Sequence, residues 1–189
     1  MILKNIKVEG NKCSFDLKAD FATANSLRRS LISDIYTFAP SKVLIKTNTS
    51  CATDEYIAHR ISMIPFVFDN SHDNVNEDTT NHASVSGRTF MTSDLSGPFK
   101  TIYDVPIIKL IDEQAVDIEI FFTKGKGSEH AKFSPVAAVA YEIDNKIIHM
   151  AFESINGETP VKHLKEALQS LNERLEHTER EVDKILYKV

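Results

Sequence analysis

Cysteine is scarce in this sequence, and its scarcity excludes two common ways of stabilising a small fold. Only Cys13 and Cys51 occur among 189 residues, which is too few for a disulfide framework or for a four-cysteine zinc site. The seven histidines add no close pair at metal-binding spacing on an expected helix. We therefore expect free, buried thiols in a reducing compartment, with no bound metal and no cofactor.

Long apolar runs and an excess of positive charge are also missing. No stretch approaches the roughly 20 apolar residues that a membrane-spanning helix needs, and charges appear from Lys4 onward, unlike in a signal peptide. The net charge of −5 provides no broad positive field toward phosphates. These absences predict a soluble, intracellular protein, of the nucleus or the cytoplasm, with no membrane contact and little or no direct nucleic-acid contact.

Signatures of catalysis are equally thin. There is no GxSxG nucleophile motif, and nothing near Cys51 would activate a thiol. The stretch Lys124–Ser128, KGKGS, is glycine-rich and basic but lacks the order of a phosphate-binding P-loop. It is either a flexible turn between strands or a binding loop for a phosphorylated ligand, and no acid or base for an enzymatic role is identifiable. We expect no catalytic residue in the chain.

The first forty residues predict a hairpin followed by a helix. Residues 1–17 alternate between apolar and polar side chains around a turn at Gly10-Asn11. Thr23 is the expected N-cap of the helix, and Pro40 closes the segment. The buried face of this helix carries residues at helical spacing, namely Ala24, Leu27, Leu31 and Ile35.

Strand patterns dominate the middle of the chain. Alternation predicts strands at 43–47 and 116–122, and a hairpin of 137–143 and 146–152 that turns at Asp144-Asn145. Between them, Asp69–His82 is almost wholly polar and is expected to be an exposed loop. The fold class predicted from these patterns is α+β.

The C-terminal segment is the clearest element. Thr159 can cap a helix that begins at Pro160, and His163 and His177 are expected to lean toward solvent. Apolar residues then recur at heptad spacing over about 25 residues: Val161, Leu164, Leu168, Leu171, Leu175, Val182 and Ile185. So long and narrow a stripe favours pairing with a partner helix. The alternative is that hairpins of the same domain cover it.

Two other stretches concentrate charge beside apolar residues. Asn25, Arg28 and Arg29 lie on the first helix, outside its apolar face. The segment Asp54–Arg60, DEYIAHR, surrounds a short apolar stripe with ionisable side chains. Such charges are either a solvated face or part of an interface, where arginine is favoured, and the residues alone leave both options open.

Taken together, four motifs in order resemble one family. Residues 24–35, ANSLRRSLISDI, look like its first helix, and 43–65, VLIKTNTSCATDEYIAHRISMIP, are similar to its strand and the motif that follows. Residues 124–135, KGKGSEHAKFSP, and 152–160, FESINGETP, match a glycine loop with an HAK motif and the start of the last helix. The chain thus resembles the third-largest subunit of multisubunit DNA-directed RNA polymerases, a family that includes the subunit of eukaryotic polymerase II, its archaeal counterpart and, remotely, the bacterial alpha N-terminal domain.

This resemblance implies a fold, a function and partners. The fold would be a dimerisation domain of an antiparallel sheet with two helices, formed by 1–41 and 139–189, and interrupted by a mostly β insertion domain at 42–138. The function would be a non-catalytic assembly platform in transcription. A small homologous subunit would pair along the helix seam of Leu164, Leu168, Leu171 and Leu175. The second-largest subunit would then dock on Asn25, Arg28, Arg29, Asp54, Glu55, His59, Arg60, Gly125, Gly127, His130 and Lys132.

The sequence also departs from the family pattern. Phe133 stands where the family usually has tryptophan, and the insertion has no cysteine cluster to hold zinc or an iron–sulfur centre. So short an insertion would suit the polymerase of a large DNA virus, in the virion or in infected-cell cytoplasm. The alternative function is a stand-alone homodimeric protein-binding module that uses the same C-terminal helix.

Overall fold

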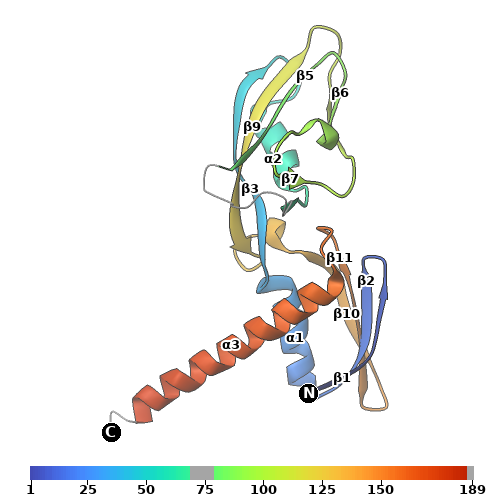
Figure 1. The fold of residues 1–189 in the computed structure, drawn as a ribbon, viewed down its shortest axis with the longest axis vertical. Helices are drawn as coiled ribbons and strands as arrows, with labels where there is room; N and C mark the ends of the chain where they lie inside the picture. The colour runs from blue at the N-terminus through green and yellow to red at the C-terminus, as the bar shows by residue number, and fades with distance from the viewer. Residues whose placement is uncertain (69–78, 187–189) are drawn as a thin grey trace. The chain divides into compact units, whose positions relative to one another are not determined.

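The computed structural model describes residues 1–68 and 79–186 (Figure 1). These residues form two compact units. The first contains Met1–Ile35, Lys126–Glu129 and Ser134–Val189, and the second contains Tyr36–Gly125 and His130–Phe133. Among the described residues, no helix is both long and apolar enough to cross a membrane.

An antiparallel sheet with helices on one face makes up the first unit. Its strands are β1 (Ile2–Glu9), β2 (Lys12–Lys18), β10 (Val136–Asp144) and β11 (Ile147–Ser154), in the order β1-β2-β11-β10. The helices are α1 (Phe21–Ser33) and α3 (Pro160–Leu186). Both hairpins and both helices confirm the sequence prediction, and the α+β class is confirmed with them. The second hairpin turns at Asn145-Lys146, one residue later than predicted, because Asp144 still pairs with Ile147.

The core of the first unit follows from the two periodicities. Alternate residues of β2 and β11 point toward the helices, while α1 contributes residues three and four apart. Every residue of the apolar face predicted for α1 is buried, although Ile35 lies just beyond the end of the helix. The core consists chiefly of Phe15, Leu17, Met150 and Phe152 from the sheet, and of Leu27, Leu31 and Leu164 from the helices.

The second unit is mostly β-structure around one short helix. A three-stranded sheet has the order β3-β9-β5, from β3 (Tyr36–Asn48), β9 (Ala115–Lys126) and β5 (Thr80–Ser86). Two small pairs join β4 (Val67–Phe68) to β7 (Phe99–Lys100) and β6 (Thr89–Met91) to β8 (Pro106–Lys109). The helical segments are α2 (Asp54–Ser62), η1 (Thr92–Asp94) and η2 (Ala131–Phe133).

A phenylalanine cluster organises the core of this unit. Phe99 stacks on Phe122 with ring centroids 3.8 Å apart, and Phe66 meets Phe122 edge-on at 5.0 Å. Ile57 and Ile61, one helical turn apart, place the apolar side of α2 in the same core. These large side chains bury enough apolar surface to hold short strand pairs that would be marginal alone.

Several local predictions were wrong, and each has a physical reason. Asp20, not Thr23, is the N-cap of α1, and the Thr23 hydroxyl donates to its carboxylate. Pro40 lies inside β3 rather than ending a segment. Cys51 is exposed, unlike the buried Cys13, because it lies in the turn between β3 and α2.

The boundaries of the compact units and of the polar segment differ from those expected. The units divide after Ile35 and near Ser134, several residues from the expected boundaries, because β3 runs unbroken through residue 41. The functional division into residues 1–41 with 139–189 and 42–138 stays a prediction. Of the predicted polar loop, residues 69–78 lie outside the described residues, whereas Thr80–His82 belong to β5, whose outward side chains are polar.

Candidate partner-binding surfaces

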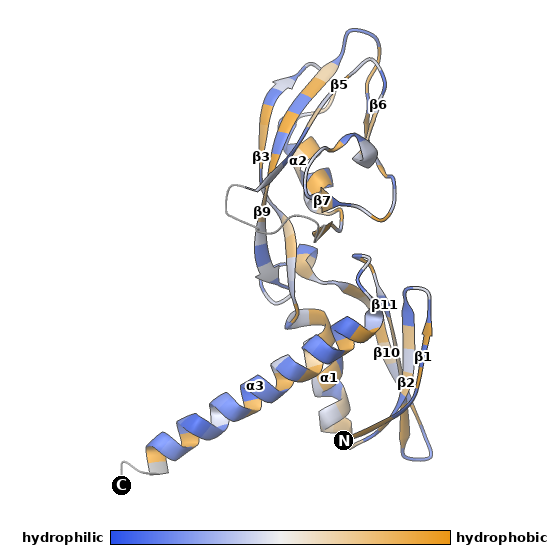
Figure 2. Ribbon diagram, viewed as in Figure 1, coloured by the Kyte–Doolittle hydropathy of each residue, from blue (hydrophilic) through white to orange (hydrophobic). Residues whose placement is uncertain are grey.

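The apolar stripe of α3 is covered at Leu164 and Leu168 and open toward its end, and its first residue, Val161, is 48% exposed. Leu164 is 4% exposed and belongs to the core of its own unit, so it is not an open seam position. Leu168 packs against that core, and Leu171 is half-buried. Leu175 is 64% exposed, Val182 is 49% exposed and Ile185 is 68% exposed. The stripe continues along the helix as spaced apolar positions among polar ones (Figure 2).

Close packing holds the first half of α3 against α1. The Ser30 hydroxyl on α1 donates to the Ala167 carbonyl on α3 over 3.0 Å, and both side chains are fully buried. Such small residues let the two backbones approach. Farther along, the Arg174 guanidinium donates to Asp34, the C-cap residue of α1, over 2.6 Å. Beyond Arg174, the described side chains of α3 are exposed.

A buried polar cluster fixes the point where α3 begins. The Asn156 side-chain oxygen lies 2.9 Å from His163 Nε2 and accepts from the Glu158 backbone N–H at 3.2 Å. Ser154 donates to the same oxygen and to the Glu158 carbonyl. His163 is 1% exposed, so the expectation that it leans toward solvent was wrong. Its ring faces the unit because His163 lies four residues before the fully buried Ala167, on the same face of the helix.

We predict that this histidine makes stability fall in mild acid. Burial lowers the pKa of His163, against the opposing charges of Glu166 and Glu158 and with a further lowering by Lys162. Below the ordinary pKa of about 6.5, the unfolded state therefore binds more protons than the folded state, and the free energy of unfolding decreases as pH falls toward the folded pKa. Urea unfolding across this range measures the slope. His163→Gln should flatten it, and His177→Gln on the exposed part of α3 should not. An unchanged slope in His163→Gln would contradict the assignment.

The arginines of α1 differ in their freedom. Arg28 is half-buried and donates through Nε and an Nη atom to Asn25 one turn earlier, at 3.2 and 3.0 Å. Arg29 is exposed, and its guanidinium makes no hydrogen bond to any residue that the structure describes. Arg29 is thus available to a partner, whereas Arg28 is already hydrogen-bonded to Asn25.

On α2, the charges predicted from the sequence follow the dipole of the helix. Asp54 and Glu55 lie in the first turn and His59 and Arg60 in the last, where acidic and basic groups respectively are favourable. Arg60 also donates to the Pro106 carbonyl at 2.8 Å and lies over the Tyr56 ring, which ties α2 to β8. Glu55 and His59 are exposed and remain available to a partner.

The glycine-rich stretch is not a flexible loop. Residues 124–126 end β9, and the turn begins only at Gly127. Gly125 is buried in the strand. A Cβ on Gly127 would lie 2.1 Å from the Ile32 carbonyl oxygen, so only glycine fits there. Among the described residues, only the one-turn 3-10 helix η2 closely follows the stretch, so it lacks the α-helix N-terminus of a phosphate-binding P-loop.

Lys132 of the HAK motif acts as an internal tie in the second unit. Its Nζ donates to the Pro40 carbonyl at 2.7 Å and lies 5.1 Å from the Phe133 ring centroid. The Lys132 backbone N–H donates to His130 Nδ1 at 3.1 Å. Thr37 donates to the Phe133 carbonyl as well, so η2 is fastened to β3 at two points. His130 itself is exposed.

We therefore predict that substitution of Lys132 lowers the free energy of unfolding, independently of any effect on docking. Lys132→Met keeps the aliphatic stem but leaves the buried Pro40 carbonyl without its donor, which should cost about 1–3 kcal/mol of unfolding free energy. Thermal or urea unfolding measures the loss. The matched control is Lys124→Met, because the Lys124 amine lies over the exposed Tyr36 ring. This substitution should change the free energy of unfolding little. Equal effects of the two substitutions would contradict the tie.

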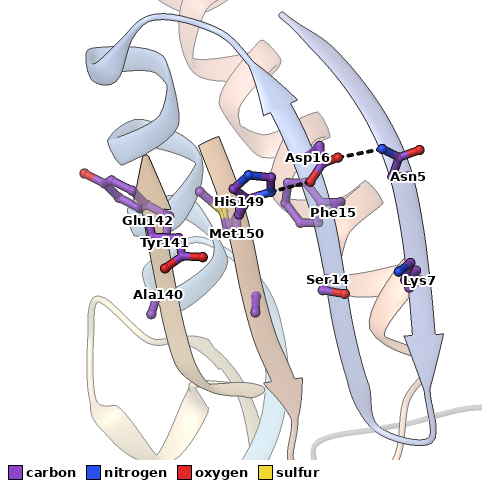
Figure 3. Close-up of a pocket in the computed structure, with 11 residues that line it drawn as sticks. Asn5, Lys7, Ser14, Phe15, Asp16, Ala140, Tyr141, Glu142, His149 and Met150 are labelled. Atoms are coloured by element: carbon purple, nitrogen blue, oxygen red, sulfur yellow. Dashed lines mark hydrogen bonds and ion pairs between the residues drawn. The ribbon is translucent and has the colours of Figure 1, made fainter. Parts of the chain in front are cut away.

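The outer face of the four-stranded sheet carries a hollow that the sequence did not reveal. Asp16 lies between two partners, Asn5 at 2.6 Å and His149 at 2.6 Å (Figure 3). The hydrogen bond from Asn5 and then that with His149 lower the pKa of Asp16. Strand register pairs Glu142 of β10 with His149 of β11. The hollow measures about 840 Å³, and only the pairing of β1, β2, β11 and β10 brings its lining together.

Comparison with known proteins decides the family. Residues 17–175 match the RNA polymerase Rpb3/Rpb11 dimerisation domain. The DNA-directed RNA polymerase subunit Rpo3 of Methanocaldococcus jannaschii is 30% identical over 171 residues, which cover 88% of each chain. This chain belongs to the Rpb3/Rpb11 dimerisation-domain family. The predicted resemblance to third-largest polymerase subunits is confirmed.

Eukaryotic members of this family are similar over less of their length. The RPB3 subunit of RNA polymerase II from Schizosaccharomyces pombe is 31% identical, with 75% of this chain and 60% of that protein covered. The polymerase I and III subunit rpac1 of Dictyostelium discoideum is 33% identical, with 66% and 46% covered. The chain thus spans about half of these longer relatives and most of the archaeal one.

Among the described residues, no three histidine, cysteine, aspartate or glutamate side chains come together to hold a metal ion. Exposed Cys51 and buried Cys13 lie in different units. The expectation that the chain binds no metal or cofactor stays a prediction.

Proposed function

We propose that this member of the Rpb3/Rpb11 family is a non-catalytic assembly subunit of a DNA-directed RNA polymerase. In this proposal it pairs with a small homologous subunit through α3. The observation that carries it is the open end of the stripe, where Leu175, Val182 and Ile185 are about half or more exposed in one line. An exposed stripe of this kind on a soluble chain indicates a protein partner.

Exposed polar side chains on each unit would receive the second-largest polymerase subunit. Arg29 in the first unit, and Glu55 and His59 in the second, are exposed, and the structure describes no hydrogen bond or ion pair of their charged ends. His130 is exposed as well, with its Nδ1 accepting from the Lys132 backbone N–H. Five other predicted docking residues are hydrogen-bonded or closely packed within their own unit, and they would act by shaping the surface that docks. They are Arg28, Arg60, Gly125, Gly127 and Lys132. Catalysis would belong to the large subunits, with little or no nucleic-acid contact by this chain.

The alternative is a stand-alone homodimer that uses the same helix. The exposed stripe supports it equally, because any apolar helix face can cover the stripe. The exposed acidic residues Glu179 and Asp183 beside the stripe favour a different chain as partner, since a second copy would bring the same negative charge.

Affinity purification from the source cell, followed by peptide sequencing, tests the proposal. Recovery of a small homologous subunit and the large polymerase subunits in stable proportion is the expected result. A monodisperse homodimer that brings down no polymerase subunit would contradict it and favour the stand-alone module.

A further inference from the structure

The open end of α3 is bordered by acidic residues on one side. Glu179 follows Leu175 by four residues and precedes Val182 by three, so its side chain lies against both. Asp183 follows Glu179 by four residues and continues the same flank. Both residues are exposed. Within the part of the chain that the structure describes, neither carboxylate has an ion-pair partner.

The other charges near the stripe are already paired. On the opposite flank, Arg174 donates to Asp34 over 2.6 Å, and Glu181 accepts from Lys184 over 2.6 Å. On the same flank as Glu179 and Asp183, Glu176 accepts from Asn172 and lies 3.7 Å from Arg180. The result is an asymmetric surface, with an apolar centre, one neutralised flank and one flank of uncompensated negative charge.

This asymmetry disfavours a second copy of the chain. In the heptad of α3, Glu179 occupies the e position, directly after the d position held by Thr178. An antiparallel copy would bring Glu179 against the same flank of its partner, which is also negative. A parallel copy would place Glu179 opposite Arg174, whose guanidinium is already held by Asp34 in its own chain.

We propose that the open end of α3 takes an amphipathic helix of a different chain, in which lysine or arginine borders the apolar stripe on the side that meets Glu179 and Asp183. This inference rests on the proposed function and specifies the chemistry of the partner. Flanking charge pairs choose partners and orientation in helix pairs, whereas the apolar seam provides most of the affinity. Glu179 and Asp183 are therefore specificity-determining residues.

Two synthetic helical peptides test the proposal on the whole chain. They share one leucine and isoleucine stripe and differ only in flanking residues, lysine in one and glutamate in the other. Fluorescence anisotropy at low salt should show about tenfold tighter binding of the lysine peptide, because like charges at the flank repel. The difference should shrink at about 1 M salt, where the Debye length is about 3 Å.

A charge-matched pair of variants assigns the effect to the flank. Glu179→Lys should remove or reverse the preference. Glu173→Lys makes the same change in net charge but lies on the far side of the helix, where Glu173 accepts from Gln169, and it should keep the preference. Circular dichroism and the thermal midpoint should match the original chain in both variants.

The outcomes separate this inference from the proposed function. Equal binding of the two peptides, a preference for the glutamate peptide, or no binding of either would overturn the charge-selected helix site, even if polymerase subunits co-purify. A clear preference for the lysine peptide without any recovered polymerase subunit would keep the site and overturn the proposed function.

Discussion

Leu175→Asp combined with Val182→Asp is expected to abolish pairing with the small subunit and all later assembly, while the isolated chain stays folded. Burial of a leucine side chain is worth about 1.5–3 kcal/mol, and both positions are open in the free chain. The double variant loses this gain twice and places two more carboxylates beside Glu179. Co-purification with the small subunit measures the effect.

The control for this prediction adds the same two side chains on the other side of the helix. His177 and Arg180 lie away from the stripe and are exposed, so His177→Asp with Arg180→Asp should leave pairing close to its original level. Thermal midpoints of both double variants should lie within a few degrees of the original. If the Leu175 and Val182 variant still co-purifies at the original ratio, the open stripe is not the interface.

Substitutions at Leu164 or Leu168 would test the folding of the first unit rather than pairing with a partner. Leu164 and Leu168 fall in the same heptad pattern as Leu175, and the sequence cannot distinguish them. They pack onto the sheet and α1, so an aspartate there would expose the core and prevent folding. Periodicity identifies the stripe on a helix, but only the length of the neighbouring elements determines where the stripe emerges into solvent.

Local patterns predicted most of the first unit. Turn residues and alternation indicated both hairpins, and helical spacing indicated the buried face of α1, because these signals depend on neighbours in the chain. The short pairs β4–β7 and β6–β8 were not predicted. Each contains few residues and depends on distant phenylalanines, such as Phe99 on Phe122, so its stability is not written in its own segment.

The predicted docking residues divide in a way that the sequence could not show. A motif identifies which residues a family uses but not whether each one contacts a partner or supports its own fold. Lys132 and Arg60 were predicted as surface charges, yet both donate to backbone carbonyls within the unit. Arg29 and His59 remain exposed. The hollow beside Asp16 and His149 was missed because these residues are 133 positions apart and meet only through strand pairing.

Gly127→Ala is expected to destabilise the first unit by about 3 kcal/mol, as an overpacked position does when backbone stands in the way. The new Cβ would lie 2.1 Å from the Ile32 carbonyl oxygen and 3.2 Å from the Ser33 Cα atom. Both neighbours are backbone at the end of α1, and the Ser128 N–H donates to the Ser33 carbonyl at 3.1 Å. The turn therefore cannot shift without breaking this contact.

Gly87→Ala distinguishes this close approach from a general cost of replacing glycine. A Cβ on Gly87 meets nothing within 4 Å, although φ there is +65°, so its substitution should cost only the strain of a left-handed residue, about 1–2 kcal/mol. Urea unfolding measures both variants, and capture of the second-largest subunit by the folded fraction separates stability from docking. A Gly127→Ala chain that unfolds at the original denaturant concentration but fails to capture the large subunit would show that Gly127 acts at the interface. Reduced stability with normal capture by the folded fraction is the result that the contact with Ile32 predicts, because the glycine then serves the packing of the turn on α1.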